Sequence, residues 1–148
     1  MKLRVLQYGL GPIGVSTARL VAEKKSLELV AAVDNDPEKV GKDVGDLDGG
    51  DALGVTVMGD LQAAIRNAAP DVALHTTSSC LKLVMPQLVE LISSGCFVVS
   101  STEELLFPAL NHSEMANEID TLAKRHGVGW PRTGLRLMTE MTLPRVVS

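Results

Sequence analysis

The stretch that decides the fold is "VLQYGLGPIGVSTARLV", residues 5–21, in which an apolar run leads through three glycines into a helical pattern. The glycines, Gly9, Gly11 and Gly14, have the spacing GxGxxG. The run before them is typical of a strand buried on both faces, and "STARLVAEKK" (16–25) has apolar residues at helical spacing. A strand, a glycine turn and a helix in this order predict the start of a βαβ unit.

Apolar runs and helical patterns alternate along the rest of the chain. Strands are predicted over residues 2–9, 27–34, 54–59, 71–78, 96–102 and 127–130. Helices are predicted over residues 16–25, 36–41, 60–70, 80–95 and 111–127. Strands separated by helix-length segments predict right-handed crossovers and a doubly wound parallel sheet. The predicted fold class is therefore α/β, a Rossmann fold in a single three-layer domain with the strand order 3-2-1-4-5-6.

Capping and turn residues set several of these helix boundaries. Asp36 and Gly41 are expected to start and stop the short second helix, and Asp60 is expected to cap the third. Pro86 is expected to divide the helix over residues 80–95, because proline removes a backbone donor and crowds the preceding turn.

Composition excludes several classes of function. A length of 148 residues fits one domain with a sizeable core. A net charge of −4 and an aromatic content of 3% argue against nucleic acid as a partner. No apolar run reaches the ~18 residues that a membrane-spanning helix needs. Two cysteines, Cys80 and Cys96, suggest neither a disulfide framework nor a zinc site, and they predict a cytoplasmic protein.

The context of the glycines predicts a dinucleotide cradle rather than a plain strand–turn–helix corner, which is the alternative interpretation. Gly9 allows the tight turn, Gly11 lets a pyrophosphate approach the backbone, and Gly14 lets the helix pack on the first strand. The amides at the start of that helix, with the positive end of its dipole behind them, favour phosphate. Asp34 ends the next strand about twenty residues later, where it can accept hydrogen bonds from the adenosine ribose.

Asp34 also bears on the choice of cofactor. A carboxylate at this position favours the ribose diol of NAD and repels the 2′-phosphate of NADP. Lys39 and Lys42 are the nearest cations; they would soften this preference, but solvated helix and loop charges are the favoured interpretation of both. The predicted cofactor is NAD, with NADP as the second possibility.

Four segments in the right order carry a resemblance to a known family: "VLQYGLGPIG", "VDNDPEKVGKDVGDL", "PDVALHTTSS" and "VVSSTEELLFP". Residues 1 to about 128 resemble the nucleotide-binding half of dihydrodipicolinate reductase-like proteins, most of all the 2,4-diaminopentanoate dehydrogenase subgroup. The resemblance implies an N-terminal Rossmann domain for NAD(P) and a following α/β domain for substrate binding and oligomerisation. It also implies hydride transfer at C4 of the nicotinamide, in oxidative deamination or in reduction of a cyclic imine.

The resemblance also implies site residues. The phosphate loop and Asp34 match the family, the end of the fourth strand matches the segment along the nicotinamide ribose, and the end of the fifth matches the loop near the carboxamide. The predicted cofactor-binding residues are Gly9, Gly11, Pro12, Ile13, Gly14, Asp34, Asn35, Thr76, Thr77, Ser78, Ser101, Thr102 and Glu103. Capping of the following helices is the alternative role for Ser78 and Thr102. No catalytic residue and no metal ligand is assigned.

Two other features have structural interpretations. His75 lies inside an apolar strand, where a core histidine with satisfied hydrogen bonds is favoured over an acid–base group. The acidic run "DVGDLDGGD" (43–51) lacks the spacing of a calcium loop and is interpreted as a solvated loop.

Residues 1–130 are predicted to form the dinucleotide-binding domain, and residues 131–148 a divergent tail where the substrate domain, absent from this chain, would begin. The stretch "GWPRTGLRLMTEM" (129–141) departs from the family pattern through either a reading-frame slip or divergence, and "TLPRVVS" (142–148) resembles it again. The apolar residues of the tail predict a homodimer.

Two functions remain open at this point. One is an oxidoreductase module that acts on a small molecule only when a substrate domain or partner completes it. The other is a stand-alone NAD-binding module for regulation or redox sensing, without catalysis.

Overall fold

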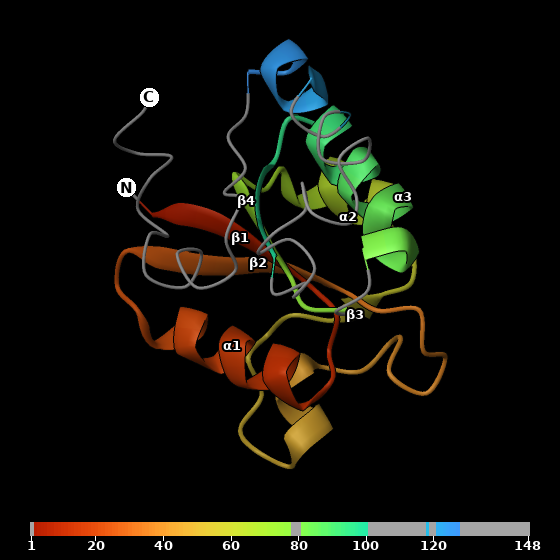
Figure 1. Ribbon diagram of the computed structural model, residues 1–148. Helices are drawn as coiled ribbons and strands as arrows, with labels where there is room; N and C mark the ends of the chain where they lie inside the picture. Colours follow the sequence, from red (N-terminus) through yellow and green to blue (C-terminus); the bar gives the residue numbers. More distant parts are fainter. Residues whose placement is uncertain (1, 78–80, 101–117, 119–120, 128–148) are drawn as a thin grey trace. The chain divides into compact units, whose positions relative to one another are not determined.

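The computed structural model describes residues 2–77, 81–100, 118 and 121–127. The chain divides into two compact units, Met1–Thr77 and Ser78–Ser148 (Figure 1). The predicted site residues Ser78, Ser101, Thr102 and Glu103 lie outside the described residues, as do the tail and the predicted strand over residues 127–130 apart from Gly127.

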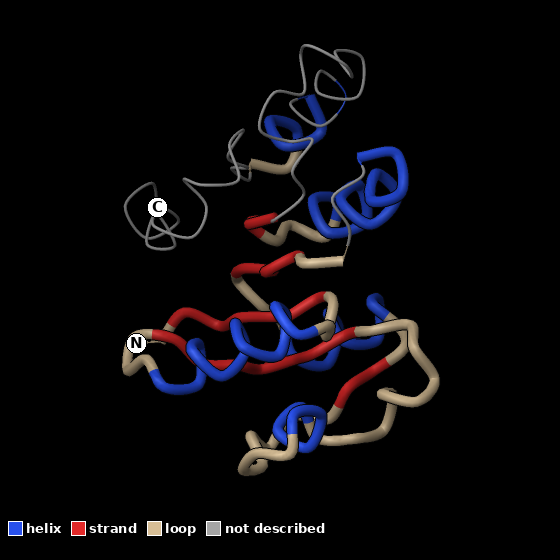
Figure 2. Tube along the Cα trace, turned by 60° about the horizontal axis from the view of Figure 1, so that its bottom comes forward, coloured by secondary structure: helices blue, strands red, loops and turns tan. Residues whose placement is uncertain are grey.

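The first unit contains four parallel strands. Its elements are β1 (Leu3–Tyr8), α1 (Pro12–Glu23), β2 (Leu27–Val33), a 3-10 helix (Val44–Asp48), β3 (Val57–Met58), α2 (Leu61–Ala68) and β4 (Val72–His75). β1 pairs in parallel with β2 on one side and with β4 on the other, and β2 pairs in parallel with β3. The order β3-β2-β1-β4 confirms the corresponding part of the prediction. Figures 1 and 2 show the central place of β1, so the glycine loop that follows it has a strand end on each side.

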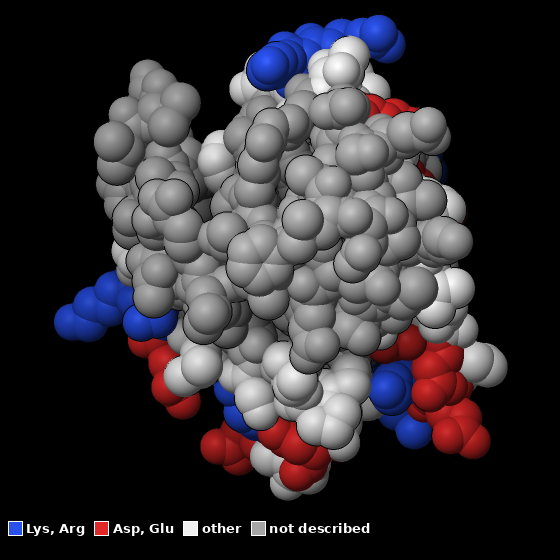
Figure 3. Space-filling view, viewed as in Figure 1, with Lys and Arg blue, Asp and Glu red and all other residues white. Residues whose placement is uncertain are grey.

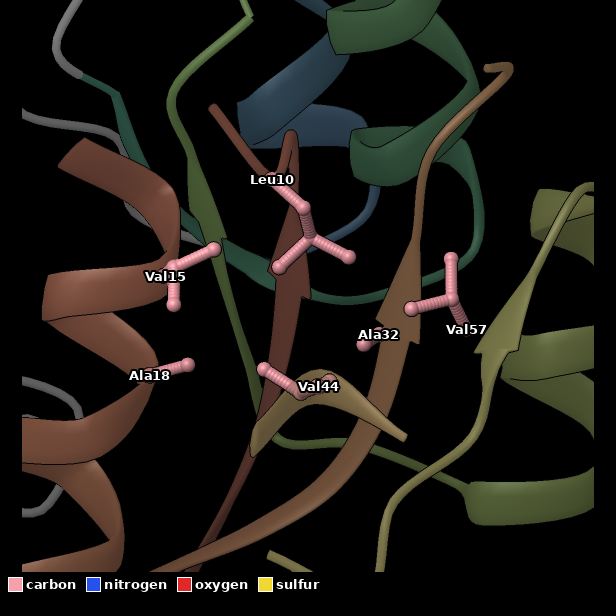
Figure 4. Packing of buried hydrophobic residues seen from close by; sticks show 6 residues of the cluster. All are labelled: Leu10, Val15, Ala18, Ala32, Val44 and Val57. Atoms are coloured by element: carbon pink, nitrogen blue, oxygen red, sulfur yellow. The ribbon is translucent and has the colours of Figure 1, made fainter. Parts of the chain in front are cut away.

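The core of this unit explains why the opening stretch folds as it does. Val5, Leu6 and Gln7 of β1 have exposed fractions of 0%, as expected for a strand covered on both faces. A buried apolar cluster joins the glycine loop, α1, the 3-10 helix and the strands β2 and β3; its members are Leu10, Val15, Ala18, Ala32, Val44 and Val57 (Figure 4). Burial of these side chains holds the start of α1 against the carboxyl ends of the strands.

The boundaries of α1 correct the predicted range of 16–25. The helix begins at Pro12, directly after Gly11 in the N-cap position, and ends at Glu23. Proline suits the first helical position because its missing amide hydrogen would have no partner there and its φ is already helical. The glycine motif is therefore the start of the helix itself.

The predicted helix over residues 36–41 is wrong, because this segment forms turns. Asp36 caps a single turn: its Oδ1 accepts from the amide of Glu38 at 2.9 Å, and its carbonyl accepts from the amides of Lys39 and Val40. Gly41, with a φ of +90°, then reverses the chain. One turn yields too few hydrogen bonds to offset the cost of helix nucleation.

The cap of α2 confirms the prediction for Asp60. Its side chain accepts from the amides of Gln62 and Ala63 at 3.0 and 3.4 Å. The helix ends at Ala68, and Ala69 closes it in the left-handed conformation with a φ of +46°.

The second unit contains α3 (Leu81–Ser93) and β5 (Phe97–Ser100), followed by helical residues 121–125 that stop at Gly127, where φ is +66°. Pro86 does not divide α3, so that prediction is wrong. Pro86 is the sixth residue of α3, so the helix loses the hydrogen bond that an amide at this position would donate to the carbonyl four residues earlier. The apolar residues on both sides of it, Val84, Met85, Leu88 and Leu91, are buried and carry the helix through. Among the described residues, no helix has the length and apolar character needed to cross a membrane.

Candidate functional site

The three glycines of the loop have different surroundings. Gly9 has a φ of +98°, and a Cβ there would lie 2.8 Å from the Thr76 backbone, so only glycine fits. A Cβ on Gly14 would lie 1.9 Å from the Gly9 carbonyl oxygen. A Cβ on Gly11 would meet nothing within 4 Å. Gly9 and Gly14 therefore shape the loop, whereas Gly11 faces open space.

The open space at Gly11 lies at the start of α1. Gly11 is the N-cap residue, no side chain accepts a hydrogen bond there, and Pro12 follows at the first helical position. The predicted residue Ile13 comes next, with an exposed fraction of 66%. The first amides of a helix have no intrahelical partner and carry the positive end of the helix dipole. This end of α1 has the features of an anion site.

Asp34 ties the end of β2 to the glycine loop. Its Oδ2 accepts from the amide of Leu10 at 2.8 Å, and its Oδ1 accepts from the amide of Asp36 at 2.9 Å. Each carboxylate oxygen has a second lone pair, so the group can still accept from a diol. The predicted residue Asn35 follows it and is exposed.

The Lys39 side chain contacts the glycine loop, whereas the sequence favoured a solvated charge at this position. Its ammonium donates to the Leu10 carbonyl at 3.0 Å and lies 4.0 Å from Asp36 Oδ2. Beside it is a cavity of about 370 Å³ at the start of α1, lined by Leu10, Gly11, Pro12, Val15, Ser16, Lys39, Leu47 and Asp48. The cavity wall thus carries one cation and one carboxylate.

The acidic run over residues 43–51, predicted as a solvated loop, is exposed at residues 46 and 48–51, but it also contains the 3-10 helix Val44–Asp48. Asp43 accepts from the amides of Leu53, Gly45 and Gly54 at 2.7–2.8 Å, and these hydrogen bonds, that from Leu53 first, lower the pKa of its carboxyl. Asp48 Oδ2 accepts from Arg19 Nε at 2.7 Å. Figure 3 shows acidic and basic side chains of described residues next to one another in the lower part of the view.

The Asp48–Arg19 pair predicts a dependence of stability on pH. The hydrogen bond from Arg19 lowers the pKa of Asp48 from 3.8 to about 2. Because the pKa is lower in the folded state, the contribution of Asp48 is complete above about pH 4 and is lost as the pH falls toward 2. Asp48→Asn should flatten the decrease in unfolding free energy between pH 4 and 2, measured by urea denaturation. Asp46→Asn, at an exposed position of the same 3-10 helix, is the control and should leave the decrease unchanged.

The end of β4 lies against the glycine loop. The amide of Thr76 donates to the Tyr8 carbonyl at 2.8 Å, and its hydroxyl donates to the Gly9 carbonyl at 3.1 Å. Thr77 is exposed, and its hydroxyl lies 3.0 Å from His75 Nε2. His75 is fully buried and meets the Tyr8 ring edge-on, with ring centroids 5.5 Å apart. The predicted place of His75 in the core is confirmed, and its Nε2 lies within hydrogen-bond distance of the Thr77 hydroxyl.

Gln7 also contacts the loop, which the sequence did not predict. Its side-chain amide donates to the Gly9 carbonyl at 3.0 Å and to the Thr76 hydroxyl at 2.9 Å. The available signal was one amide side chain directly after the apolar residues Val5 and Leu6. Among the predicted residues that the structure describes, those that lie in or directly against one loop are Gly9, Gly11, Pro12, Ile13, Gly14, Asp34 and Thr76.

A parallel sheet whose central strand ends in a glycine turn at a helix start, with a carboxylate on the neighbouring strand end, defines the class of NAD(P)-binding Rossmann domains. The comparison with known families agrees with this class. The family described as "Dihydrodipicolinate reductase, N-terminus" matches residues 3–128, and the chain belongs to that family. The resemblance seen in the sequence is thereby confirmed.

Individual relatives share this domain. The chain is 31% identical to the 2,4-diaminopentanoate dehydrogenase of Acetoanaerobium sticklandii over 90% of its own length and 38% of that protein. It is 32% identical to the solved amine dehydrogenase of Mycobacterium smegmatis, with a TM-score of 0.79 over 88% of this chain and 38% of that one. A more distant likeness, at 21% identity and a TM-score of 0.64, covers 86% of this chain and 33% of the WlbA dehydrogenase of Bordetella pertussis, solved with NADH and UDP-GlcNAcA. The chain thus spans about two fifths of the length of the 2,4-diaminopentanoate dehydrogenase and of the amine dehydrogenase.

Proposed function

We propose that this chain binds NAD(H) through the loop GLGPIG (9–14) and Asp34, and that it transfers hydride only when a substrate domain or a partner chain completes the site. The observation that carries the proposal is the open space at Gly11, at the uncapped start of α1, beside a carboxylate that already contacts the same loop. Bound NADH in a solved structure of the same fold supports a nicotinamide dinucleotide as the ligand.

The proposed orientation follows from these groups. The pyrophosphate lies on the amides at the start of α1, because the glycine leaves the backbone accessible there. The adenosine ribose lies at Asp34, and the nicotinamide half runs toward the end of β4 at Thr76 and Thr77. Ser78 and residues 101–103 are proposed to complete the nicotinamide side.

NAD is proposed to bind more tightly than NADP. The Asp34 carboxylate accepts hydrogen bonds from a diol but repels a phosphate dianion. Lys39, whose ammonium contacts the Leu10 carbonyl, moderates this preference without reversing it, since the Asp34 carboxylate contacts the same loop through the Leu10 amide.

Replacing Asp34 by alanine should narrow the ratio of NAD to NADP affinity by about tenfold, because roughly 1.4 kcal/mol of discrimination is lost with the charge. Calorimetric titration of both dinucleotides measures the ratio. Asp34→Asn is the matched variant: it removes the charge but keeps one acceptor for the Leu10 amide. An unchanged ratio in both variants would rule out the role given to Asp34.

The proposed chemistry is hydride transfer to or from C4 of the nicotinamide. Transfer requires the substrate carbon to be held against the ring, and the relatives are more than twice as long as this chain. NAD-dependent turnover of 2,4-diaminopentanoate, by this chain alone and with a companion chain, tests the proposal. NAD binding without turnover in either case favours the alternative, a non-catalytic NAD-binding module.

Three further predictions stand as proposals. Residues 1–130 are proposed as the dinucleotide-binding domain and residues 131–148 as a divergent tail at the position where a substrate domain would begin. A homodimer is proposed from the apolar residues of that tail. A cytoplasmic location is proposed from the cysteine content, of which Cys96 is buried.

A further inference from the structure

Gln7 is a buried polar side chain in β1, which lies between β2 and β4. Its exposed fraction is 0%, as are those of its neighbours Val5 and Leu6. Nε2 donates to two acceptors, the Gly9 carbonyl at 3.0 Å and the Thr76 hydroxyl at 2.9 Å. The hydroxyl proton of Thr76 is directed to the same carbonyl at 3.1 Å. The Gly9 carbonyl can only accept, so the amide must present its nitrogen to this group.

The carbonyl oxygen of the Gln7 side chain lowers the stability of the fold. Gln7 Oε1 is buried and has no hydrogen-bond partner among the described residues. A buried polar atom without a partner costs about 1–3 kcal/mol. A leucine would avoid this cost, so stability alone does not account for glutamine here.

The Gly9 carbonyl oxygen contacts several parts of the loop region. It accepts from both Gln7 and Thr76, and it lies where a Cβ on Gly14 would be, at 1.9 Å. The position of this oxygen therefore fixes how closely the loop and the first turn of α1 lie against each other. The three groups form a bracket, hereafter the Gln7–Gly9–Thr76 bracket, that joins β1, the loop and the end of β4.

We propose that Gln7 is a positioning residue for the pyrophosphate subsite: through the bracket it holds the loop in its phosphate-binding conformation before the dinucleotide arrives. The proposal rests on the proposed function, since it concerns the same site. Preorganised donors avoid the ordering cost on binding, so Gln7 contributes to affinity through the bracket without touching the ligand itself. The adenosine end, held by Asp34, does not depend on it.

The test compares ligands with and without phosphate. Gln7→Leu should lower the affinity for NAD and for ADP by about tenfold and leave that for adenosine, followed by NMR titration, within about twofold. Without ligand, exchange of the backbone amides of Gly11, Ile13 and Gly14 should be faster than in the wild type. Gln62→Leu, at an exposed position of α2, is the matched control and should change neither.

A second pair of variants keeps the test independent of how well Gln7→Leu folds. Thr76→Val removes the hydroxyl and should weaken ADP binding. Thr76→Ser keeps the hydroxyl and should restore the affinity for ADP. Equal losses for ADP and adenosine, or unchanged ADP affinity with unchanged amide exchange, would overturn the proposal. If the wild type binds neither NAD nor ADP, the proposed function itself fails, while the amide-exchange comparison still decides whether the bracket orders the loop.

Discussion

Replacing Gly11 by valine should abolish dinucleotide binding while the domain stays folded. A Cβ at Gly11 meets nothing within 4 Å, and its φ of −71° is open to any residue, so the side chain fits the unliganded protein. The isopropyl group then occupies the space above the first amides of α1, where the pyrophosphate would lie. We expect the affinity for NAD to fall by about 100-fold or more, equivalent to roughly 3 kcal/mol.

Calorimetric titration measures the loss, and circular dichroism with thermal unfolding checks the fold. Gly11→Ala is the graded variant, with a smaller group in the same space and an intermediate loss expected. A folded Gly11→Val protein that binds NAD as the wild type does would show that the phosphates lie elsewhere.

Replacing Gly14 by alanine should instead destabilise the fold. The added Cβ would lie 1.9 Å from the Gly9 carbonyl oxygen and 2.9 Å from the Thr76 hydroxyl, so α1 must move away from the loop. Overpacking against backbone costs about 3 kcal/mol, which lowers the melting temperature by roughly 10 °C for a domain of this size. Calorimetric melting curves measure the shift.

Ser16→Ala is the matched control for Gly14→Ala, because position 16 is exposed on the same helix. Alanine favours helix there, so a small rise in melting temperature is expected. A Gly14→Ala protein as stable as this control would contradict the close approach of α1 to the loop.

Much of the first unit could be predicted because its signals are local. The apolar run of β1, the glycine spacing and the Asp60 cap each lie within a few neighbouring residues, and they predicted the elements and the parallel order. The errors arose where local signals competed with other effects. The segment 36–41 has a cap and a stop but is too short to nucleate a helix, and burial of apolar residues around Pro86 outweighs its lost hydrogen bond.

The site was predictable in part for the same reason. The predicted tight turn at Gly9 and close packing at Gly14 agree with the surroundings of these residues, and the space at Gly11 is open. The contacts of Gln7 with Thr76 and of Lys39 with Leu10 join residues 69 and 29 positions apart. No local pattern encodes such pairs, because they depend on which strand ends the sheet brings together.

Calorimetric titration of the unmodified chain with NAD and NADP tests the central claim most directly. The open phosphate loop and the Asp34 carboxylate predict one dinucleotide per chain, with NAD bound more tightly than NADP. Failure to bind either dinucleotide would contradict the cradle, and a clear preference for NADP would contradict the role of Asp34.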